Sequence, residues 1–466
     1  KFRNRKETHL RSNSMKYNSP TLKFSISGLR GVYPADIAPD KWVDYVRAFA
    51  AVLPAGPIAI ARDARATGPA LVDIASGVLR LLGREVHDLG LVPTPTIKAY
   101  VAGKKCAGGL MVSASHNPAE YNALKFIGKG GFFFSAADNA RFSAALEAAA
   151  DWGDYRKQGS LIDAHEAAMD FHISTILKVV KKPRRKLTVV IDPVGSCGGA
   201  IAVQLLKKLG VRTFAIHLKE TPAFPRPPEP TAEALGKLAA AVRKHKADIG
   251  FAFDPDADRL SLVDEKGRAI GEEYTLPLAI LAAAKPKGKI VANLSTSMLT
   301  ESAAVMRKCS FIRSAVGEAN VVEQMLKEKS QLGGEGNGGV IDARVPSFGR
   351  DALTGVAHIL SLVASERKPL SGWVASLPPF VMTKQVIKGV GAEEMRSITD
   401  KVMGQLTDAK LDTRDGFHVS GQLTLNGQNT PCWIHLRSSN TEPVVRLIAE
   451  AQGKRELETL LGYAKA

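Results

Sequence analysis

Hydrophobic and polar positions repeat one pattern three times along the chain. Short apolar runs begin at Gly56, Leu187 and Gly288, and each ends in a turn rich in Gly, Ser, Thr or Asp (GPIAIARDARATG, LTVVIDPVGSCGG and GKIVANLSTSMLT). An amphipathic stretch with helical spacing follows each run, and a second short apolar run comes after it. A strand, a helix and another strand form a βαβ unit, which favours parallel pairing. We therefore expect three related α/β domains.

The chain beyond residue 377 follows a different pattern. A strand-like and then a helix-like segment (TKQVIKGVGAEEMRSITDKVMGQL) precede three alternating segments, and a helical segment closes the chain. The predicted fold class is therefore α/β, with three related domains of mixed, mainly parallel sheets and a C-terminal α+β domain. Breaks in the pattern predict a basic tail at 1–14 and domains at 15–165, 166–284, 285–376 and 377–466. The tail is expected either to be disordered or to precede a natural start at Met15.

Composition narrows the class of protein. With 45% hydrophobic and 23% charged residues, the 466-residue chain is globular rather than disordered or fibrous. Its four cysteines are far apart and form neither a CxxC pair nor a zinc spacing, which is typical of reduced thiols in a cytoplasmic protein. No apolar run approaches the ~18 residues of a membrane helix, so we expect no membrane partner.

The formal net charge of +17 raises the question of a nucleic-acid partner. The sequence shows no RNA-binding aromatic signature, zinc finger or long basic helix, and its longest basic cluster, KVVKKPRRK at 178–186, lies where a linker is expected. A basic enzyme that acts on sugar phosphates explains the charge equally well, because a positive field gathers anionic substrates. A catalytically silent anion-binding protein stays open as an alternative. The oligomeric state, monomer or homodimer, also stays open.

Ser115 stands in the first segment with recognisable chemistry, GGLMVSASHNPAEYNALKF at 108–126. A strand is expected to end just before it, at the edge where α/β folds place ligands. The neighbouring His116 suggests a Ser–His hydrolase, but adjacent residues form a poor nucleophile–base pair and no G-x-S-x-G is present. Ser115 is then either a serine that carries a phosphoryl group or part of a structural turn.

Three carboxylates, those of Asp254, Asp256 and Asp258, alternate directly after the apolar run IGFAF. Like charges this close repel one another, so a bound cation is the natural explanation, with an acidic solvent turn as the alternative. Oxygen ligands favour Mg²⁺ or Ca²⁺ over zinc, and an EF-hand is excluded because its glycine and twelfth-position glutamate are missing. Arg259 follows at once, placed to balance charge or to hold a phosphate.

Two later loops are rich in groups that bind sugars and phosphates. In GGEGNGG at 333–339 only Glu335 and Asn337 carry side chains, and they suit sugar hydroxyls; a nucleotide P-loop is not matched, and a surface loop stays open. The segment HLRSSNTEPVVR at 435–446 gathers donors suited to a phosphate dianion, or forms a polar hairpin turn. Its candidate ligands are Arg437, Ser439, Asn440, Thr441 and Arg446.

Together with FSISGLRG near the N-terminus, these segments resemble the motifs of the α-D-phosphohexomutase family. SASHNP resembles its phosphoserine loop, DPDADR its metal loop, GEGNGG its sugar loop and RSSNTEPVVR its phosphate loop, in the family's order. The resemblance covers the chain from about residue 20 onward. It implies four domains around a central cleft and the interconversion of hexose 1- and 6-phosphates through a 1,6-bisphosphate, which is intermediate and activator.

The resemblance also assigns roles to residues. It implies that the catalytic set is Ser115, Lys125, Arg30 and His116, that one Mg²⁺ per chain is held by Asp254, Asp256, Asp258 and an oxygen of phosphorylated Ser115, and that the substrate is held by Arg259, Glu335, Asn337, Arg437, Ser439, Asn440, Thr441 and Arg446. A phosphatase remains the alternative enzyme, since a phosphoserine can also lose its phosphoryl group to water.

The sugar is the least determined part of the prediction. Gly339 stands where many members have His, and the loop SAVGEANVVEQM at 314–325 lacks the Lys and Arg that often flank its VG. A histidine at this position would oppose a 2-amino group when protonated, whereas a glycine cannot. Ser113 in SASHNP also resembles the glucosamine members. We therefore predict a phosphoglucosamine mutase, with phosphomannomutase or phosphoglucomutase as the alternative.

Overall fold

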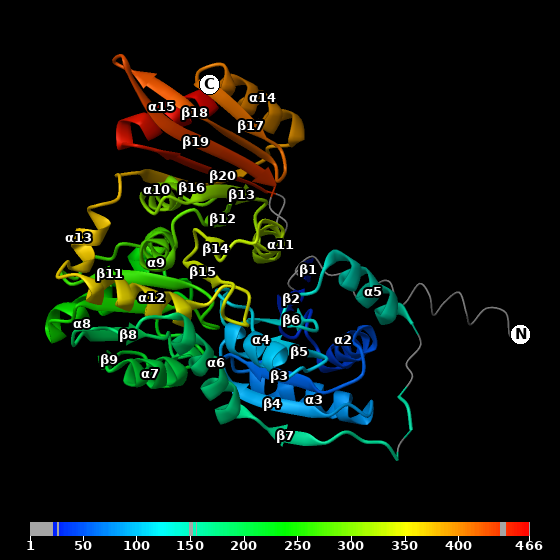
Figure 1. Ribbon diagram of the computed structural model, residues 1–466. Helices are drawn as coiled ribbons and strands as arrows, with labels where there is room; N and C mark the ends of the chain where they lie inside the picture. Colours follow the sequence, from blue (N-terminus) through cyan, green and yellow to red (C-terminus); the bar gives the residue numbers. More distant parts are fainter. Residues whose placement is uncertain (1–21, 26–27, 149–151, 155, 439–443, 466) are drawn as a thin grey trace, which may run out of the picture.

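The computed structural model describes residues 22–25, 28–148, 152–154, 156–438 and 444–465. Four sheets follow one another along the chain and form an arc, from the first (blue and cyan) to the fourth (orange and red) in Figure 1. The three α/β units and the sheet-rich C-terminal unit confirm the predicted fold class. Among the described residues, no helix combines the length and the apolar character needed to cross a membrane.

The first unit is built on a seven-stranded sheet with the order β1-β2-β6-β5-β3-β4-β7. Its strands are β1 (Lys23–Ser25), β2 (Gly28–Val32), β3 (Ile58–Arg62), β4 (Val86–Leu91), β5 (Gly108–Val112), β6 (Tyr121–Ile127) and β7 (Leu161–Asp163), and its helices are α2 (Pro39–Val52), α3 (Gly68–Leu81), α4 (Thr94–Gly103), α5 (Ala136–Glu147) and α6 (His165–Val179). The half from β5 to β7 is parallel, and the half from β1 to β5 is antiparallel. The turn between β5 and β6 is too short for a helical crossover, so this pair must be antiparallel.

The second and third units each carry a four-stranded sheet with one antiparallel edge strand. The second has the order β11-β10-β8-β9 and contains β8 (Thr188–Asp192), β9 (Arg212–Ala215), β10 (Ile249–Phe253) and β11 (Leu260–Asp264), with α7 (Gly198–Leu209), η1 (Ala232–Leu235) and α8 (Gly236–His245). The third has the order β13-β12-β14-β15 and contains β12 (Lys289–Asn293), β13 (Ser310–Ser314), β14 (Leu332–Glu335) and β15 (Gly339–Asp342), with η2 (Glu272–Tyr274), α9 (Thr275–Ala283), α10 (Met298–Met306), α11 (Glu318–Glu328), α12 (Ala352–Ser365) and α13 (Leu370–Val374).

The fourth unit is an antiparallel sheet of order β16-β20-β19-β18-β17. It contains β16 (Val381–Lys388), β17 (Thr407–Asp412), β18 (Phe417–Leu425), β19 (Gln428–Ser438) and β20 (Val444–Ala451), with α14 (Ala392–Met403) and α15 (Lys454–Lys465) packed against it. The pattern along the chain did not predict β17, because this edge strand (TDAKLD) is polar and largely exposed.

Apolar packing joins the first three units and leaves the fourth separate. One buried cluster runs from Ala59 to Leu377, while the fourth unit has its own cluster from Met395 to Leu460. Two helices lie beside the predicted domain boundaries: α6 packs on α4 and β4, and α9 packs on α10 and α12. The predicted boundary between residues 284 and 285 therefore follows a helix that belongs by packing to the third unit. All four cysteines are free and buried.

Candidate active site

A cavity of about 810 Å³ opens where the four units meet. Its walls bring together residues that are far apart in the sequence. The predicted site residues that line it are Arg30, Ser115, His116, Lys125, Arg259, Glu335, Asn337, Arg437 and Arg446. Ser439, Asn440 and Thr441 fall outside the residues that the structure describes, so their predicted role stays a prediction.

Ser115 lies in the tight turn between β5 and β6. Its backbone has φ of +50°, in the left-handed region that residues other than glycine rarely adopt. The turn holds it there, since the Ser115 N–H donates to Ser113 Oγ at 3.0 Å and the Ser113 hydroxyl donates to Asp63 Oδ2 at 2.6 Å. The Ser115 hydroxyl itself donates to Asp254 Oδ2 at 2.7 Å. The serine of the first unit therefore meets the acidic loop of the second.

Arg65 holds the same turn in place through hydrogen bonds, and its role was not predicted from the sequence. Its guanidinium is fully buried and donates to the carboxylate of Asp63 and to four backbone carbonyl groups of the turn. The acceptors are the carbonyl oxygens of Ser115, Asn117, Pro118 and Tyr121. The sequence signal was the basic-acidic turn ARDARATG, but nothing in it shows which carbonyl groups Arg65 contacts.

His116 is adjacent to the serine but is poorly placed as its base. Its Nδ1 lies 3.4 Å from Ser115 Oγ, at the long limit of a hydrogen bond. Burial lowers the pKa of His116 well below its ordinary value, and the nearby Arg259 and Arg30 lower it further. The imidazole is therefore neutral at pH 7. This geometry agrees with the argument against a Ser–His hydrolase.

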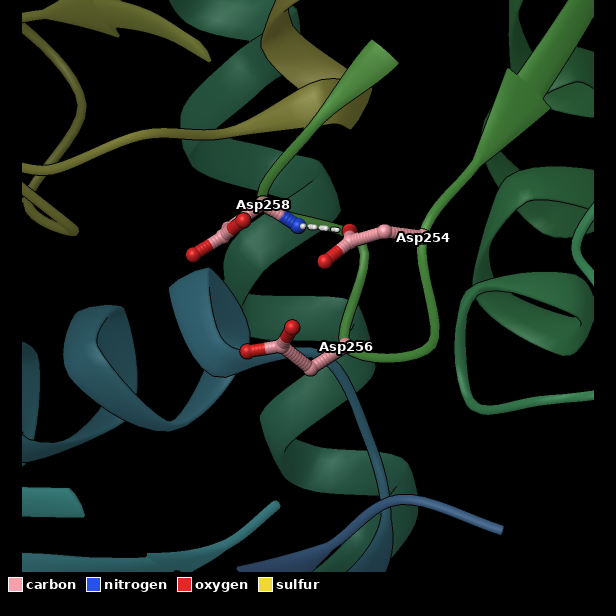
Figure 2. Close-up of side chains that lie close together, drawn as sticks. All are labelled: Asp254, Asp256 and Asp258. Carbon is pink, nitrogen blue, oxygen red and sulfur yellow. Dashed lines mark hydrogen bonds between the residues drawn. The ribbon is translucent and has the colours of Figure 1, made fainter. Parts of the chain in front are cut away.

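Asp254, Asp256 and Asp258 are fully buried after the end of β10. One oxygen from each lies within 4.8 Å of the others, and Figure 2 shows the three side chains around a common space. Asp254 Oδ1 accepts the backbone N–H groups of Asp258 and Arg259, both at 3.1 Å, which closes the loop around the carboxylate. The apolar strand thus delivers three carboxylates to one point.

The carboxylates of Asp256 and Asp258 each accept hydrogen bonds through one oxygen only. Asp256 Oδ2 accepts from Lys125 and Thr94, and Asp258 Oδ2 accepts from Arg350 at 2.6 Å. The Oδ1 atoms of Asp256 and Asp258 are buried without a hydrogen-bond partner among the described residues. Buried carboxylate oxygens without partners are costly, and an oxygen-only ligand set suits Mg²⁺. The residues present therefore fit a bound Mg²⁺ ion.

The pKa values of the three aspartates in the acidic loop are shifted in different directions. Burial and the two neighbouring carboxylates raise the pKa of Asp254 well above its ordinary value, and burial likewise raises the pKa of Asp258 although Arg350 opposes it. The pKa of Asp256 is lowered, because the charge of Lys125 and the hydrogen bonds with Lys125, Asp254 and Thr94 together outweigh burial there. Burial by itself would lower the pKa of Lys125. The negative charges of Asp256 and Asp258 outweigh this effect, so the pKa of Lys125 is raised. The neighbouring cations thus leave two of the three carboxylates, Asp254 and Asp258, with raised pKa values.

Two arginines, Arg30 and Arg259, line the cavity near the turn of Ser115 and the acidic loop. Arg30 on β2 donates to Asn117 Oδ1 at 2.6 Å, beside the turn of Ser115. Arg259 forms an ion pair with Glu229 and lies 3.8 Å from Asp258 Oδ1. Both side chains line the cavity, so the positive charge needed near a phosphate is present at the predicted positions.

Glu335 and Asn337 reach the cavity from the turn between β14 and β15. The Glu335 carboxylate accepts from Asn293 at 2.7 Å and from Arg350 at 2.9 Å, while Asn337 Oδ1 is buried without a hydrogen-bond partner among the described residues. The position of Gly339 is not an open space. A Cβ atom at 339 would stand 2.3 Å from Cδ of Arg350, so the arginine fills the space that a side chain at 339 would need.

The fourth unit contributes a basic face. Arg437 on β19 and Arg446 on β20 are cross-strand partners, so their side chains emerge on the same face of the sheet. Arg437 Nε lies 3.6 Å from Asp415 Oδ1. Lys384 on β16, which the sequence analysis missed, lines the same cavity and pairs with Glu272 and Glu273 of the third unit.

Comparison with known proteins agrees with this geometry. Models described as phosphoglucomutase/phosphomannomutase, alpha/beta/alpha domains I, II and III match residues 21–151, 170–267 and 272–380. A "Probable phosphoglucosamine mutase" of Methanocella arvoryzae is 30% identical over 450 residues, covering 95% of this chain and 97% of the relative. A phosphoglucomutase/phosphomannomutase of Thermococcus kodakarensis is 29% identical over 460 residues, covering 94% and 96%.

Solved structures show the same architecture. A phosphoglucomutase/phosphomannomutase family protein from Burkholderia thailandensis superposes with a TM-score of 0.79 at 25% identity, covering 96% of each chain. The open form of parafusin, a phosphoglucomutase from Paramecium, has a TM-score of 0.74 at 15% identity, covering 96% of this chain and 94% of its own, and this likeness shows the fold alone. Because the three domain models together match more than half of the chain in consecutive order, the chain belongs to the phosphoglucomutase/phosphomannomutase, or α-D-phosphohexomutase, family.

Proposed function

We propose that the chain, a phosphohexomutase by family, interconverts glucosamine 1-phosphate and glucosamine 6-phosphate through phosphorylated Ser115 and a 1,6-bisphosphate. One observation carries the proposal. A single cavity joins the strained serine, Arg259 directly after the acidic loop, the sugar loop and the basic face of the fourth unit, and the hydroxyl of that serine donates to Asp254 of the buried acidic loop. A phosphatase needs the first two of these features, but it does not need a second phosphate site on the far wall.

Phosphoryl transfer asks a protein mainly for positioning and charge neutralisation. Phosphorylated Ser115 would pass its phosphoryl group to a sugar hydroxyl: the bond from phosphorus to Oγ breaks, a bond to the sugar oxygen forms, and the hydroxyl proton ends on Ser115 Oγ. Returning the other phosphoryl group to Ser115 reverses this balance, so the cycle consumes neither proton nor phosphate. Arg30 and Lys125 lie beside the serine and would offset the charge on the phosphoryl oxygens.

Magnesium would be held by Asp254, Asp256, Asp258 and an oxygen of phosphorylated Ser115, and it would neutralise phosphoryl charge. The chain's own residues prepare that site. Lys125 and Arg350 each hold one oxygen of a carboxylate and leave the other oxygen without a hydrogen-bond partner among the described residues. The alternative of an acidic solvent turn does not account for full burial of all three carboxylates.

The bisphosphate must turn over between the two transfers, so one clamp has to accept either end of the sugar. Arg437 and Arg446, with Ser439, Asn440 and Thr441, are proposed to hold the phosphate that does not react. Glu335 and Asn337 are proposed to hold hydroxyls in both orientations. The unpartnered Asn337 Oδ1 supports this role, because a hydroxyl or ammonium donor would satisfy it.

Glucosamine is favoured by two observations. Relatives named phosphoglucosamine mutase are the commonest among those that match over nearly the whole chain. Arg350, whose methylene carbons lie where a side chain at 339 would be, is paired with the carboxylates of Asp258, Glu318 and Glu335, so the sugar loop is not a site of excess positive charge. A 2-ammonium group is therefore tolerated there, and phosphomannomutase or phosphoglucomutase activity is the alternative.

The test is a coupled assay with glucosamine 6-phosphate, mannose 1-phosphate and glucose 1-phosphate, in which inorganic phosphate is measured in parallel. The proposal predicts isomer formation without phosphate release and the highest kcat/KM for glucosamine phosphate. One differing group discriminates by only a few kcal/mol, so weaker turnover of glucose phosphate is expected. Phosphate release without isomer would establish a phosphatase, and preference for mannose or glucose phosphate would reject glucosamine alone.

A further inference from the structure

Arg350, in the loop between β15 and α12, contacts three carboxylates from two different units at once. Its Nη2 donates to Asp258 at 2.6 Å, its Nη1 to Glu335 at 2.9 Å and its Nε to Glu318 at 3.2 Å. The side chain is 12% exposed and lines the cavity. Every nitrogen of the guanidinium is therefore committed to a different acid.

The network continues into the first unit. Lys98 of α4, whose side chain is 1% exposed, pairs with the other oxygen of Glu318 and lies 4.4 Å from the ring centre of Phe133. Glu318 begins α11, and Arg350 leads into α12. Lys98 thus fixes Glu318, and Glu318 in turn fixes the Nε side of Arg350. Glu318 thus holds the Nε side of Arg350, while its two Nη atoms donate to Glu335 and Asp258.

From this geometry we infer that Arg350 is a positioning residue that aims Asp258 and Glu335 together, so that one side chain sets both the metal loop and the sugar loop. The inference rests on the proposed function for the roles of these two acids. Arg350 takes Oδ2 of Asp258 and leaves Oδ1 without a hydrogen-bond partner among the described residues, with only the longer ion pair to Arg259 at 3.8 Å, which is the arrangement needed for ligation through one oxygen. It takes Oε2 of Glu335 in the same way, while Oε1 accepts from Asn293.

A planar guanidinium can satisfy two divergent acids, whereas a lysine ammonium is a single point of charge. Arg350→Lys therefore separates positioning from charge balance. If Arg350 only balances charge, the lysine variant should behave like the wild type. If it positions both acids, the variant should bind Mg²⁺ about tenfold more weakly and show a KM for the hexose phosphate about tenfold higher, as expected for one charged hydrogen bond lost on each side.

The experiment measures Mg²⁺ binding by calorimetry without sugar, and KM and kcat for glucosamine 6-phosphate at saturating Mg²⁺. Arg344→Lys is the matched control, because Arg344 grips Asp342 through two nitrogens on the same chain segment but does not line the cavity. Weakening of both affinities in Arg350→Lys but not in the control supports the inference. Unchanged affinities overturn it, and a change in only one of them overturns the shared role.

A second variant guards against misfolding, which circular dichroism and the unfolding temperature would reveal. Glu318→Gln leaves Arg350 charged but loosens its Nε side, so both affinities should fall by about threefold; no change would overturn the inference. Failure of the proposed function would give a different experimental result from failure of this inference. In that case the wild-type chain would isomerise no hexose phosphate, whereas failure of this inference leaves wild-type turnover intact and the variants unaffected.

Discussion

Neutralising Asp254 should stabilise the protein without metal and remove its response to metal. The ligand atoms of the three carboxylates lie within 4.8 Å of one another. At an effective dielectric constant of about 20, each ionised pair at that distance repels by about 3 kcal/mol. Asp254→Asn keeps an oxygen for the backbone N–H groups of Asp258 and Arg259 and removes two such pairs. Because the raised pKa of Asp254 already relieves part of this repulsion, we expect a gain of about 2 kcal/mol.

The metal response should change in the opposite direction. At a Mg²⁺ concentration of 100 times the dissociation constant, binding stabilises the wild-type fold by about 2.7 kcal/mol. Loss of one charged ligand is expected to weaken binding at least a hundredfold, which leaves about 0.4 kcal/mol at the same concentration. Four thermal unfolding scans, of the wild type and of Asp254→Asn, each with a chelator and with Mg²⁺, measure the stability gain without metal and the loss of the response to Mg²⁺.

Asp264→Asn is the matched control for this experiment. Asp264 is as buried as Asp254, but its carboxylate is paired with Arg268 and accepts two backbone N–H groups, so its loss should only destabilise. The reasoning is refuted if Asp254→Asn lowers the unfolding temperature in chelator as Asp264→Asn does. It is refuted equally if the wild-type chain shows no shift with Mg²⁺.

Three further outcomes are expected. Peptide mass spectrometry should find a phosphoryl group on Ser115, and Ser115→Ala should abolish isomerisation; full activity in that variant would exclude the serine. Arg437→Ala should raise KM for both the 1- and the 6-phosphate by roughly ten- to a hundredfold, the value of one charged hydrogen bond, and an unchanged KM would move the clamp elsewhere. Burial raises the pKa of Glu273 from 4.5 to about 7 against the opposing effect of Lys384, so folding stability should be full below about pH 4.5 and fall as the pH rises through 7. Glu273→Gln should remove up to about 3 kcal/mol of that fall, whereas Glu272→Gln, at the other acid on Lys384, should not; equal pH profiles of the two variants would reject the assignment.

The local chemistry of the site could be predicted from the sequence because it follows buried strands. β5 ends just before the turn of Ser115, and β10 ends just before Asp254, and both strands are buried along their whole length. An apolar run that stops at a polar turn marks the edge of a sheet where side chains become available to ligands. The same reasoning failed at β17, whose polar residues lie at an exposed edge and leave no apolar signal.

The contacts between segments could not be predicted in this way. Lys125 and Asp256 are 131 residues apart, Thr94 and Asp256 are 162 apart, and Arg350 and Asp258 are 92 apart. Periodicity along a chain carries no information on how separate units face one another. Gly339 shows the consequence, since an arginine eleven residues later occupies the space that a side chain at this position would need.

The way the fourth unit is attached explains why the cavity exists at that place. The first three units share one apolar cluster, whereas the fourth meets the third through polar groups. Glu450 of β20 accepts from the hydroxyl of Ser297 and the backbone N–H of Met298 at the start of α10, and Asp415 accepts the N–H of Val316 at 3.0 Å. Directional bonds of this kind fix an orientation without filling the space between the units with side chains. The basic face of the fourth unit therefore borders the same cavity of about 810 Å³ as the serine of the first unit and the sugar loop of the third.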